Sequence, residues 1–259
     1  MIRSAWVALL ASASLLVLGT LVILGAYAGF PRGFFDWAAR TWSRIILWSS
    51  VTPVRVIGAG NVSTDRPQVI IANHQSMFDV FAIAANMPRR FHFVAKKELE
   101  RIPVFGRAAR AAGHVFIDRG DREAAIRSLK VANRLMREKN STAILFPEGT
   151  RSLTGGLQPF KKGPFVMALD SGVEVVPTVI DGTLEILPKR GVRIRPHPIT
   201  LRFGRPISPE GYRDGGRDAF MVRVHAVMGD MLAELRAPAG YGGPEFLEPF
   251  EPAGAAAEE

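Results

Sequence analysis

The chain begins with a long, uninterrupted apolar stretch. Residues 4–31 contain no Asp, Glu, Lys or Arg. As one helix this stretch would be about 40 Å long, against a bilayer hydrocarbon core of about 30 Å. A cleaved signal peptide is one alternative, because Ala26-Tyr27-Ala28 has the small-x-small form of a cleavage site. A buried core helix is another, but such helices are usually shorter. The length therefore favours a membrane anchor.

The next segment has polar and apolar faces at helical spacing. Asp36, Arg40 and Arg44 share one face of a predicted helix over residues 34–48, and the opposite face is apolar. This pattern is typical of a helix in the membrane interface, and also of an amphipathic helix packed on a soluble core. We favour the interface, because the segment follows a long apolar helix. Three arginines follow the apolar run and only Arg3 precedes it, which predicts a cytoplasmic (inner) membrane protein whose C-terminal body faces the cytoplasm.

From residue 53 onward, short apolar runs alternate with helical patterns. We predict strands at residues 54–58, 68–72, 91–95, 142–146, 174–180 and 199–204, and helices at 77–87, 121–139 and 218–236. Several of the runs are continuously apolar, as strands buried on both faces are. The alternation predicts an α/β fold in which helices flank a mixed central sheet, preceded by a membrane-associated two-helix segment.

These patterns divide the chain into three parts. We expect a membrane-associated helical anchor at residues 1–52, an α/β domain at 53–236 and an acidic tail at 237–259. The tail is rich in Pro, Gly and Ala and has five Glu but no Lys or Arg. Such a composition predicts disorder.

Charge and cysteine content narrow the possible partners and chemistry. The formal net charge is +9, and it would be higher without the acidic tail. An anionic partner is expected, such as a phospholipid membrane or a phosphorylated substrate. The basic segments have few interleaved aromatic residues, which argues against nucleic acid. The chain has no cysteine, which excludes disulfides, thiolate nucleophiles and Cys-ligated metal sites.

The first candidate for chemistry is Asn73-His74-Gln75-Ser76-Met77-Phe78-Asp79, where a predicted strand gives way to a helix. Ligands of open α/β sheets bind at such strand ends. His74 can act as a general base, and Asp79 can fix its tautomer if His74 lies in the loop before the helix. An alternative is purely structural, because Ser76-x-x-Asp79 is also a helix-capping pattern.

A second candidate is the turn Phe146-Pro147-Glu148-Gly149-Thr150-Arg151-Ser152, which follows another predicted strand. Its backbone N–H groups, its hydroxyl and the Arg151 guanidinium are suited to bind a phosphate. Glu148 could pair with Arg151 or accept a hydrogen bond from a substrate hydroxyl. The alternative is a polar turn with a surface ion pair.

Two shorter segments are the remaining candidates for chemistry. In Gly113-His114-Val115-Phe116-Ile117-Asp118-Arg119, an apolar triplet ends in Asp-Arg, and Arg119 could be a second phosphate ligand or a solvated strand-end residue. In Val176-Pro177-Thr178, proline interrupts a predicted strand and indicates a sheet edge or a bulge.

The order of these four segments resembles the glycerolipid acyltransferases, and most closely the bacterial 1-acyl-sn-glycerol-3-phosphate acyltransferases. The resemblance covers residues 54–205 and extends to the two-helix N-terminal part. It implies the transfer of a fatty acyl group from acyl-CoA or acyl-acyl carrier protein to the free hydroxyl of lysophosphatidic acid, which gives phosphatidic acid. It also implies that no cofactor and no metal is required.

The resemblance assigns roles to individual residues. It implies that His74 is the general base and that Asp79 orients it. The acceptor phosphate would lie against the residues of two segments, namely Glu148, Gly149, Thr150, Arg151, Gly113 and Arg119. Pro177 would belong to the acyl or donor side.

Several assignments stay open. Lys96 and Lys97 are candidates to stabilise the anionic tetrahedral intermediate, or they belong to a solvated basic surface. His92, His114, His197 and His225 have no partner pattern, and we expect them to be structural. The acceptor could be another lysolipid, such as a lyso-ornithine lipid. A non-catalytic protein that binds anionic membranes or nucleic acid is the alternative from a different class.

Overall fold

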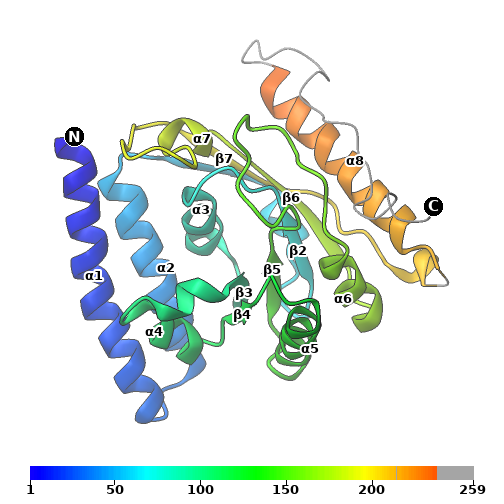
Figure 1. Cartoon of the computed structure of the whole chain (residues 1–259), viewed down its shortest axis with the longest axis horizontal. Coiled ribbons are helices and arrows are strands. Elements are labelled where there is room, and N and C mark those ends of the chain that lie inside the picture. Colours follow the sequence, from blue (N-terminus) through cyan, green and yellow to red (C-terminus); the bar gives the residue numbers. More distant parts are fainter. Residues whose placement is uncertain (214, 238–259) are drawn as a thin grey trace.

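The computed structural model describes residues 1–213 and 215–237, and it contains one seven-stranded sheet in the order β1-β7-β6-β2-β5-β3-β4 (Figure 1). All neighbouring pairs are parallel except β6 with β7. The strands are β1 (Val54–Ile57), β2 (Val69–Ala72), β3 (Phe91–Lys96), β4 (Val115–Ile117), β5 (Thr142–Leu145), β6 (Val175–Asp181) and β7 (Ile199–Phe203). This confirms the predicted mixed α/β sheet. The predicted acidic tail lies outside the described residues, apart from residue 237.

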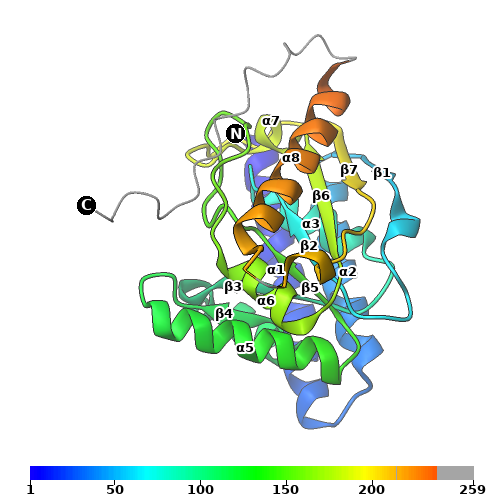
Figure 2. The same ribbon diagram turned by 90° about the vertical axis from the view of Figure 1, so that its right-hand side faces the viewer.

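The two faces of the sheet carry separate cores. Alternate residues of β2 point to opposite faces, so Ile70 and Ala72 join one apolar cluster and Val69 and Ile71 join the other. The helices that cover the first face are α2 (Arg32–Ser49), α3 (Phe78–Asn86) and α7 (Thr183–Ile186). The second face is covered by α5 (Arg122–Glu138), α6 (Gly163–Ser171) and α8 (Arg217–Arg236), which stand in front of the sheet in Figure 2. Burial on both faces explains why these strands are continuously apolar.

The helix α1 (Ile2–Tyr27) forms an outer layer beside α2 (Figure 1). By length and composition it could cross a membrane, and only 17% of its most apolar 18-residue window is buried. Its outward face is a stripe of exposed apolar side chains, made up of Ile2, Trp6, Leu9, Leu16, Val17, Leu21, Leu24 and Tyr27. Further along, Gly19 allows a close approach to the segment around Val104, because a Cβ there would lie 2.6 Å from Val104 Cγ1.

The surroundings of α2 differ from the expectation of an interface helix. Its polar face meets the α3–β3 loop, where Arg40 donates to the carbonyl oxygens of Met87 at 3.1 Å and Arg89 at 2.7 Å. Asp36 lies 3.5 Å from Arg90. The helix is therefore packed between α1 and α3, and the apolar surface left exposed belongs mainly to α1.

Four of the α-helices and strands were not predicted, namely α4 (Phe105–Ala111), β4, α6 and α7. They are short, and short segments carry too few periods for a hydrophobic pattern to be distinctive. Two of these elements lie between β3 and β5: β4 forms the edge of the sheet, and α4 packs against α1.

Pro177 does not mark a sheet edge, because β6 pairs with β2 on one side and β7 on the other. On the β7 side the ladder is interrupted between the Thr178–Phe203 pair and the Val175–Ile207 bridge. There the Pro177 carbonyl accepts from Gly204 N at 2.7 Å. Since the N and O of one strand residue point to the same side, the missing N–H of Pro177 faces this irregular segment.

Candidate active site

The candidate residues gather at the carboxyl ends of four adjacent parallel strands. His74 follows β2, the turn at residues 146–152 follows β5, Lys96 ends β3 and Arg119 follows β4. Because β2, β5, β3 and β4 are neighbours in the sheet, their ends meet at one edge. Segments far apart in the sequence thereby form one cavity of about 480 Å³.

His74 and Asp79 form a direct hydrogen bond. His74 Nδ1 lies 2.7 Å from Asp79 Oδ2, and the carboxyl group is fully buried. The carboxylate is an acceptor, so the proton of the neutral imidazole lies on Nδ1 and the lone pair on Nε2. The ring stacks on Phe146 at a centroid distance of 4.2 Å and lines the cavity. This arrangement holds a base at the cavity wall.

Asp79 also organises the backbone before α3. Its Oδ2 accepts from Gln75 N at 2.7 Å and from Ser76 N at 2.8 Å, and its Oδ1 accepts from the Thr183 hydroxyl. The predicted capping role and the predicted partnership with His74 therefore belong to the same carboxylate. Ser76 itself donates to Leu187 O at 2.7 Å, and α3 begins two residues later.

Glu148 connects the two main loops of the site. Its Oε1 accepts from His74 N at 3.0 Å, and its Oε2 accepts from Gln158 Nε2 at 2.7 Å. Ser152 N donates in turn to His74 O at 2.7 Å. Glu148 is buried and does not line the cavity, and within the described residues it forms no ion pair with Arg151. Burial raises the pKa of Glu148 from 4.5 to about 8.

The raised pKa of Glu148 predicts a specific pH dependence of stability. Between pH 4.5 and about 8 the folded protein retains a proton on Glu148 that the unfolded chain has lost. Stability therefore falls as the pH rises through this window and levels off above it. We expect Glu148→Gln, which cannot titrate, to lose this part of the slope when unfolding midpoints are measured from pH 5 to pH 8. An exposed control, Glu138→Gln, should follow the wild type. Parallel curves for wild type and Glu148→Gln would contradict this account.

Cationic groups line the cavity close to His74. Arg119 donates to the carbonyl of Gly149, and Arg151 contributes a second guanidinium to the wall. Gly149 has a φ of 71° that favours glycine, and a Cβ there would lie 2.7 Å from Lys161 Cε. The Thr150 hydroxyl accepts from Lys189 Nζ at 2.7 Å. These groups make this end of the cavity positively charged, and guanidinium groups are common ligands of anions.

Of the remaining predicted residues, one lines the cavity and the others do not. Lys96 lines it and pairs with Glu98 at 2.9 Å, whereas Lys97 pairs with Asp118 at 3.0 Å outside it. Gly113 and Pro177 do not line the cavity. With a φ of 91°, Gly113 ends α4 through two hydrogen bonds, from its own N to Arg110 O and from His114 N to Ala109 O. Gly113 thus directs the chain into β4, the strand that carries Arg119.

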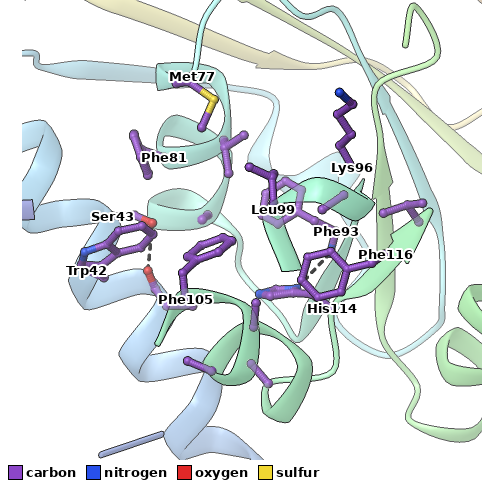
Figure 3. Close-up of a pocket in the computed structure, with 18 of the residues that line it drawn as sticks. Trp42, Ser43, Met77, Phe81, Phe93, Lys96, Leu99, Phe105, His114 and Phe116 are labelled. Atoms are coloured by element: carbon purple, nitrogen blue, oxygen red, sulfur yellow. Dashed lines mark hydrogen bonds between the residues drawn. The ribbon is translucent and has the colours of Figure 1, made fainter. Parts of the chain in front are cut away.

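Beyond its charged end, the cavity is apolar and runs between α1, α2, α3 and α4. Figure 3 shows the rings of Trp42, Phe81, Phe93, Phe105, His114 and Phe116 around it, with the Lys96 amine pointing away from them. Trp42 also donates to Ala11 O at 3.1 Å, which connects α2 to α1. The space is therefore suited to a long apolar chain whose polar end lies near His74. Among the described residues there is no group of three or more His, Cys, Asp or Glu that could hold a metal ion.

Comparison with known proteins places this geometry in a family. Residues 53–181 match the family described as Acyltransferase. The chain is 36% identical over 196 residues to a 1-acyl-sn-glycerol-3-phosphate acyltransferase of Limnanthes douglasii, covering 76% of this chain and 69% of that one. The chain belongs to this acyltransferase family. It is also 36% identical to the Cocos nucifera enzyme of the same name, over 75% of this chain and 63% of that one.

A solved structure supports the same assignment for this acyltransferase. The crystal structure of the 1-acyl-sn-glycerophosphate (LPA) acyltransferase PlsC from Thermotoga maritima is similar with a TM-score of 0.79 and 27% identity. The similarity covers 91% of this chain and 95% of that one, so it extends beyond the sheet and the helices that cover it. The predicted enzyme class and fold are thereby confirmed.

Two residues of the acyltransferase site could not be found in the sequence. Thr183 binds Asp79 from the start of α7, and Lys189 reaches Thr150 from the loop after it. Both lie more than a hundred residues after His74, with no local pattern that marks them. Two of the other histidines fit the structural role expected of them: His114 Nδ1 accepts from Phe93 N at 3.1 Å, and burial lowers the pKa of His92 to about 3 and that of His114 to about 4.

Proposed function

We propose that the protein transfers a fatty acyl group from acyl-CoA or acyl-acyl carrier protein to the free hydroxyl of lysophosphatidic acid, giving phosphatidic acid. The observation that carries this proposal is the His74–Asp79 pair at the junction of a cationic pocket and an apolar cavity. The names of the relatives support lysophosphatidic acid as the acceptor. The relative from Thermotoga maritima supports grouping the chain with bacterial enzymes, although the sequence relatives named above come from plants.

His74 acts as the base in this mechanism. Nε2 takes the proton of the acceptor hydroxyl as its oxygen attacks the thioester carbonyl carbon. The negative charge on Asp79 stabilises the imidazolium that forms. The tetrahedral intermediate collapses by breaking the carbon–sulfur bond, and the proton passes from His74 to the leaving thiolate. No covalent enzyme intermediate is required. Lys96 lines the cavity and is the candidate to stabilise the oxyanion, for which its amine would have to leave Glu98.

The cationic end of the cavity binds the acceptor phosphate in this proposal. Arg119 and Arg151 supply guanidinium groups, and Thr150 and Lys189 line the same cavity. Burial lowers the pKa of Arg119, because its charge is partly removed from water. A bound dianion would compensate that desolvation, since a charged hydrogen-bonding partner stabilises the ionised form. The apolar cavity would hold an acyl chain.

We propose that the enzyme lies on one leaflet of an anionic phospholipid membrane, at the cytoplasmic face of the inner membrane. The exposed apolar stripe of α1 supports membrane contact. Two contacts favour a single leaflet: Ser4, near the start of α1, accepts from Ile194 N at 2.9 Å, and Gly19 packs against Val104. About 22 Å of helix therefore lies along the catalytic part. If α1 crossed the bilayer, the residues that contact Ser4 and Gly19 would have to lie inside the bilayer as well.

The phosphate assignment can be tested by acceptor competition. We expect the purified enzyme to prefer lysophosphatidic acid over an unphosphorylated monoacylglycerol and over a lyso-ornithine lipid. Arg151→Gln should lower kcat/KM for lysophosphatidic acid about 10- to 100-fold, the value of a hydrogen bond to a charged group, and should leave the poor acceptors unchanged. Arg122→Gln, an exposed charge outside the cavity, serves as the control. An equal loss for all acceptors, or a preference for the ornithine lipid, would contradict the phosphate site.

A further inference from the structure

The loop between α7 and β7 is strongly basic. Residues 187–198 contain Lys189, Arg190, Arg193 and Arg195, and no acidic residue occurs between Glu185 and Glu210. The three arginines are exposed, and within the described part of the chain they form no ion pair. Their charges are therefore available to an anionic partner.

The shape of this loop is fixed by its own backbone. Arg195 N donates to Ile186 O at 3.0 Å and closes the base of the loop, and Gly191 N donates to Pro188 O at 2.8 Å at the turn. Val192, next to that turn, is 76% exposed and stands directly before Arg193. An exposed valine among arginines has no role in the folded core, and it fits a surface that enters the interfacial region of a bilayer.

The loop is attached both to α1 and to the active site. On one side, Ile194 N donates to Ser4 Oγ at 2.9 Å, and the Leu187 and Ile194 side chains pack on the cluster that includes Val7 of α1. On the other side, Lys189 Nζ reaches Thr150 at the cavity wall. Figure 1 shows this segment running from α7 to the N-terminal end of α1. The loop therefore has a fixed position relative to the exposed apolar residues Ile2 and Trp6.

We propose that the loop at residues 187–195 is a second membrane contact, in which Arg190 and Arg193 bind the phosphates of anionic phospholipids and Val192 enters the interface. An acidic protein would be attracted by the same charges. The exposed valine and the attachment to the apolar end of α1 favour a lipid surface. Through Lys189, this contact would hold the charged end of the cavity at the level of the headgroups. The inference rests on the proposed membrane location and deepens it.

Vesicle binding by the purified full-length protein tests this proposal. The variants are Arg190→Gln/Arg193→Gln and Val192→Ser. A charge-matched control is Lys130→Gln/Arg134→Gln, on the exposed face of α5, which covers the other side of the sheet. Since each cation near an anionic surface contributes about fivefold, we expect the double arginine variant to bind about 25-fold more weakly to vesicles containing phosphatidylglycerol. On pure phosphatidylcholine vesicles it should bind like the wild type. Val192→Ser should bind several-fold more weakly to both, and the control should not change.

Wild-type vesicle binding by the double arginine variant would overturn the proposal. If that variant also had a raised KM for acyl-acyl carrier protein, the loop would be assigned to a protein partner. Acyl transfer from acyl-CoA in detergent micelles separates this inference from the proposed function, because it does not depend on vesicle binding. There the variants should match the wild type, whereas a wild type that is inactive with both acyl-CoA and acyl-acyl carrier protein would contradict the function itself.

Discussion

Replacement of His74 by alanine is expected to lower kcat by about 10²- to 10⁴-fold, the usual contribution of a general base. The side chain is the only titratable partner of Asp79 within hydrogen-bonding distance among the described residues, and it lies at the cavity wall. Removal of the ring leaves the acceptor hydroxyl without a group to take its proton. Steady-state transfer to lysophosphatidic acid, measured with saturating donor, would give the size of the loss.

Folding must be separated from chemistry in this variant. The His74 side chain is 14% exposed, so its loss opens a partly solvated space and not a sealed core cavity. We expect the unfolding midpoint and the binding of substrate to change little. His197→Ala, outside the cavity, is the matched control and should retain full activity. Activity of His74→Ala within a few-fold of wild type would remove His74 from the mechanism.

Replacement of Asp79 by asparagine is expected to have an effect of similar size, about 10²- to 10⁴-fold in kcat. The amide has nearly the shape of the carboxylate but carries no charge to stabilise the imidazolium. Its oxygen can still accept from Gln75 N and Ser76 N, so the loop before α3 can keep its conformation. Kinetics of the variant, together with its unfolding midpoint, would measure the two effects separately.

Thr183→Val provides the comparison for Asp79→Asn. It removes one donor to the Asp79 carboxylate and leaves the charge in place. We expect a loss of less than about tenfold, because one neutral hydrogen bond contributes about 0.5–1.5 kcal/mol. If Thr183→Val were as inactive as Asp79→Asn, the positioning of the carboxylate and not its charge would be the important factor.

The sequence predicted most of the sheet and the contact between His74 and Asp79, because both depend on local patterns. The apolar run before Asn73 and the helix after Met77 place His74 in a strand-to-helix loop, and the structure has that arrangement. What the local pattern could not provide is the order of the strands. Only the adjacency of β2 and β5 brings Glu148 to the backbone of His74, so the role of Glu148 as a buried link was not predicted.

The cavity depends even more on distant contacts. Its apolar part requires α1 and α2 to pack on α4, a seven-residue helix that was not predicted. The amphipathic pattern of α2 favours the membrane interface over packing on a soluble core, but in the structure Arg40 donates to two backbone carbonyls of the α3–β3 loop. A hydrophobic pattern shows which face is polar, and it does not identify what that face meets.

Acyl transfer by the purified wild-type enzyme tests the central claim most directly. The enzyme would be given lysophosphatidic acid with either acyl-CoA or acyl-acyl carrier protein, and the lipid products would be identified by mass spectrometry. The account predicts phosphatidic acid and free thiol in equal amounts with at least one donor. Free thiol without phosphatidic acid, or no reaction with either donor, would contradict it.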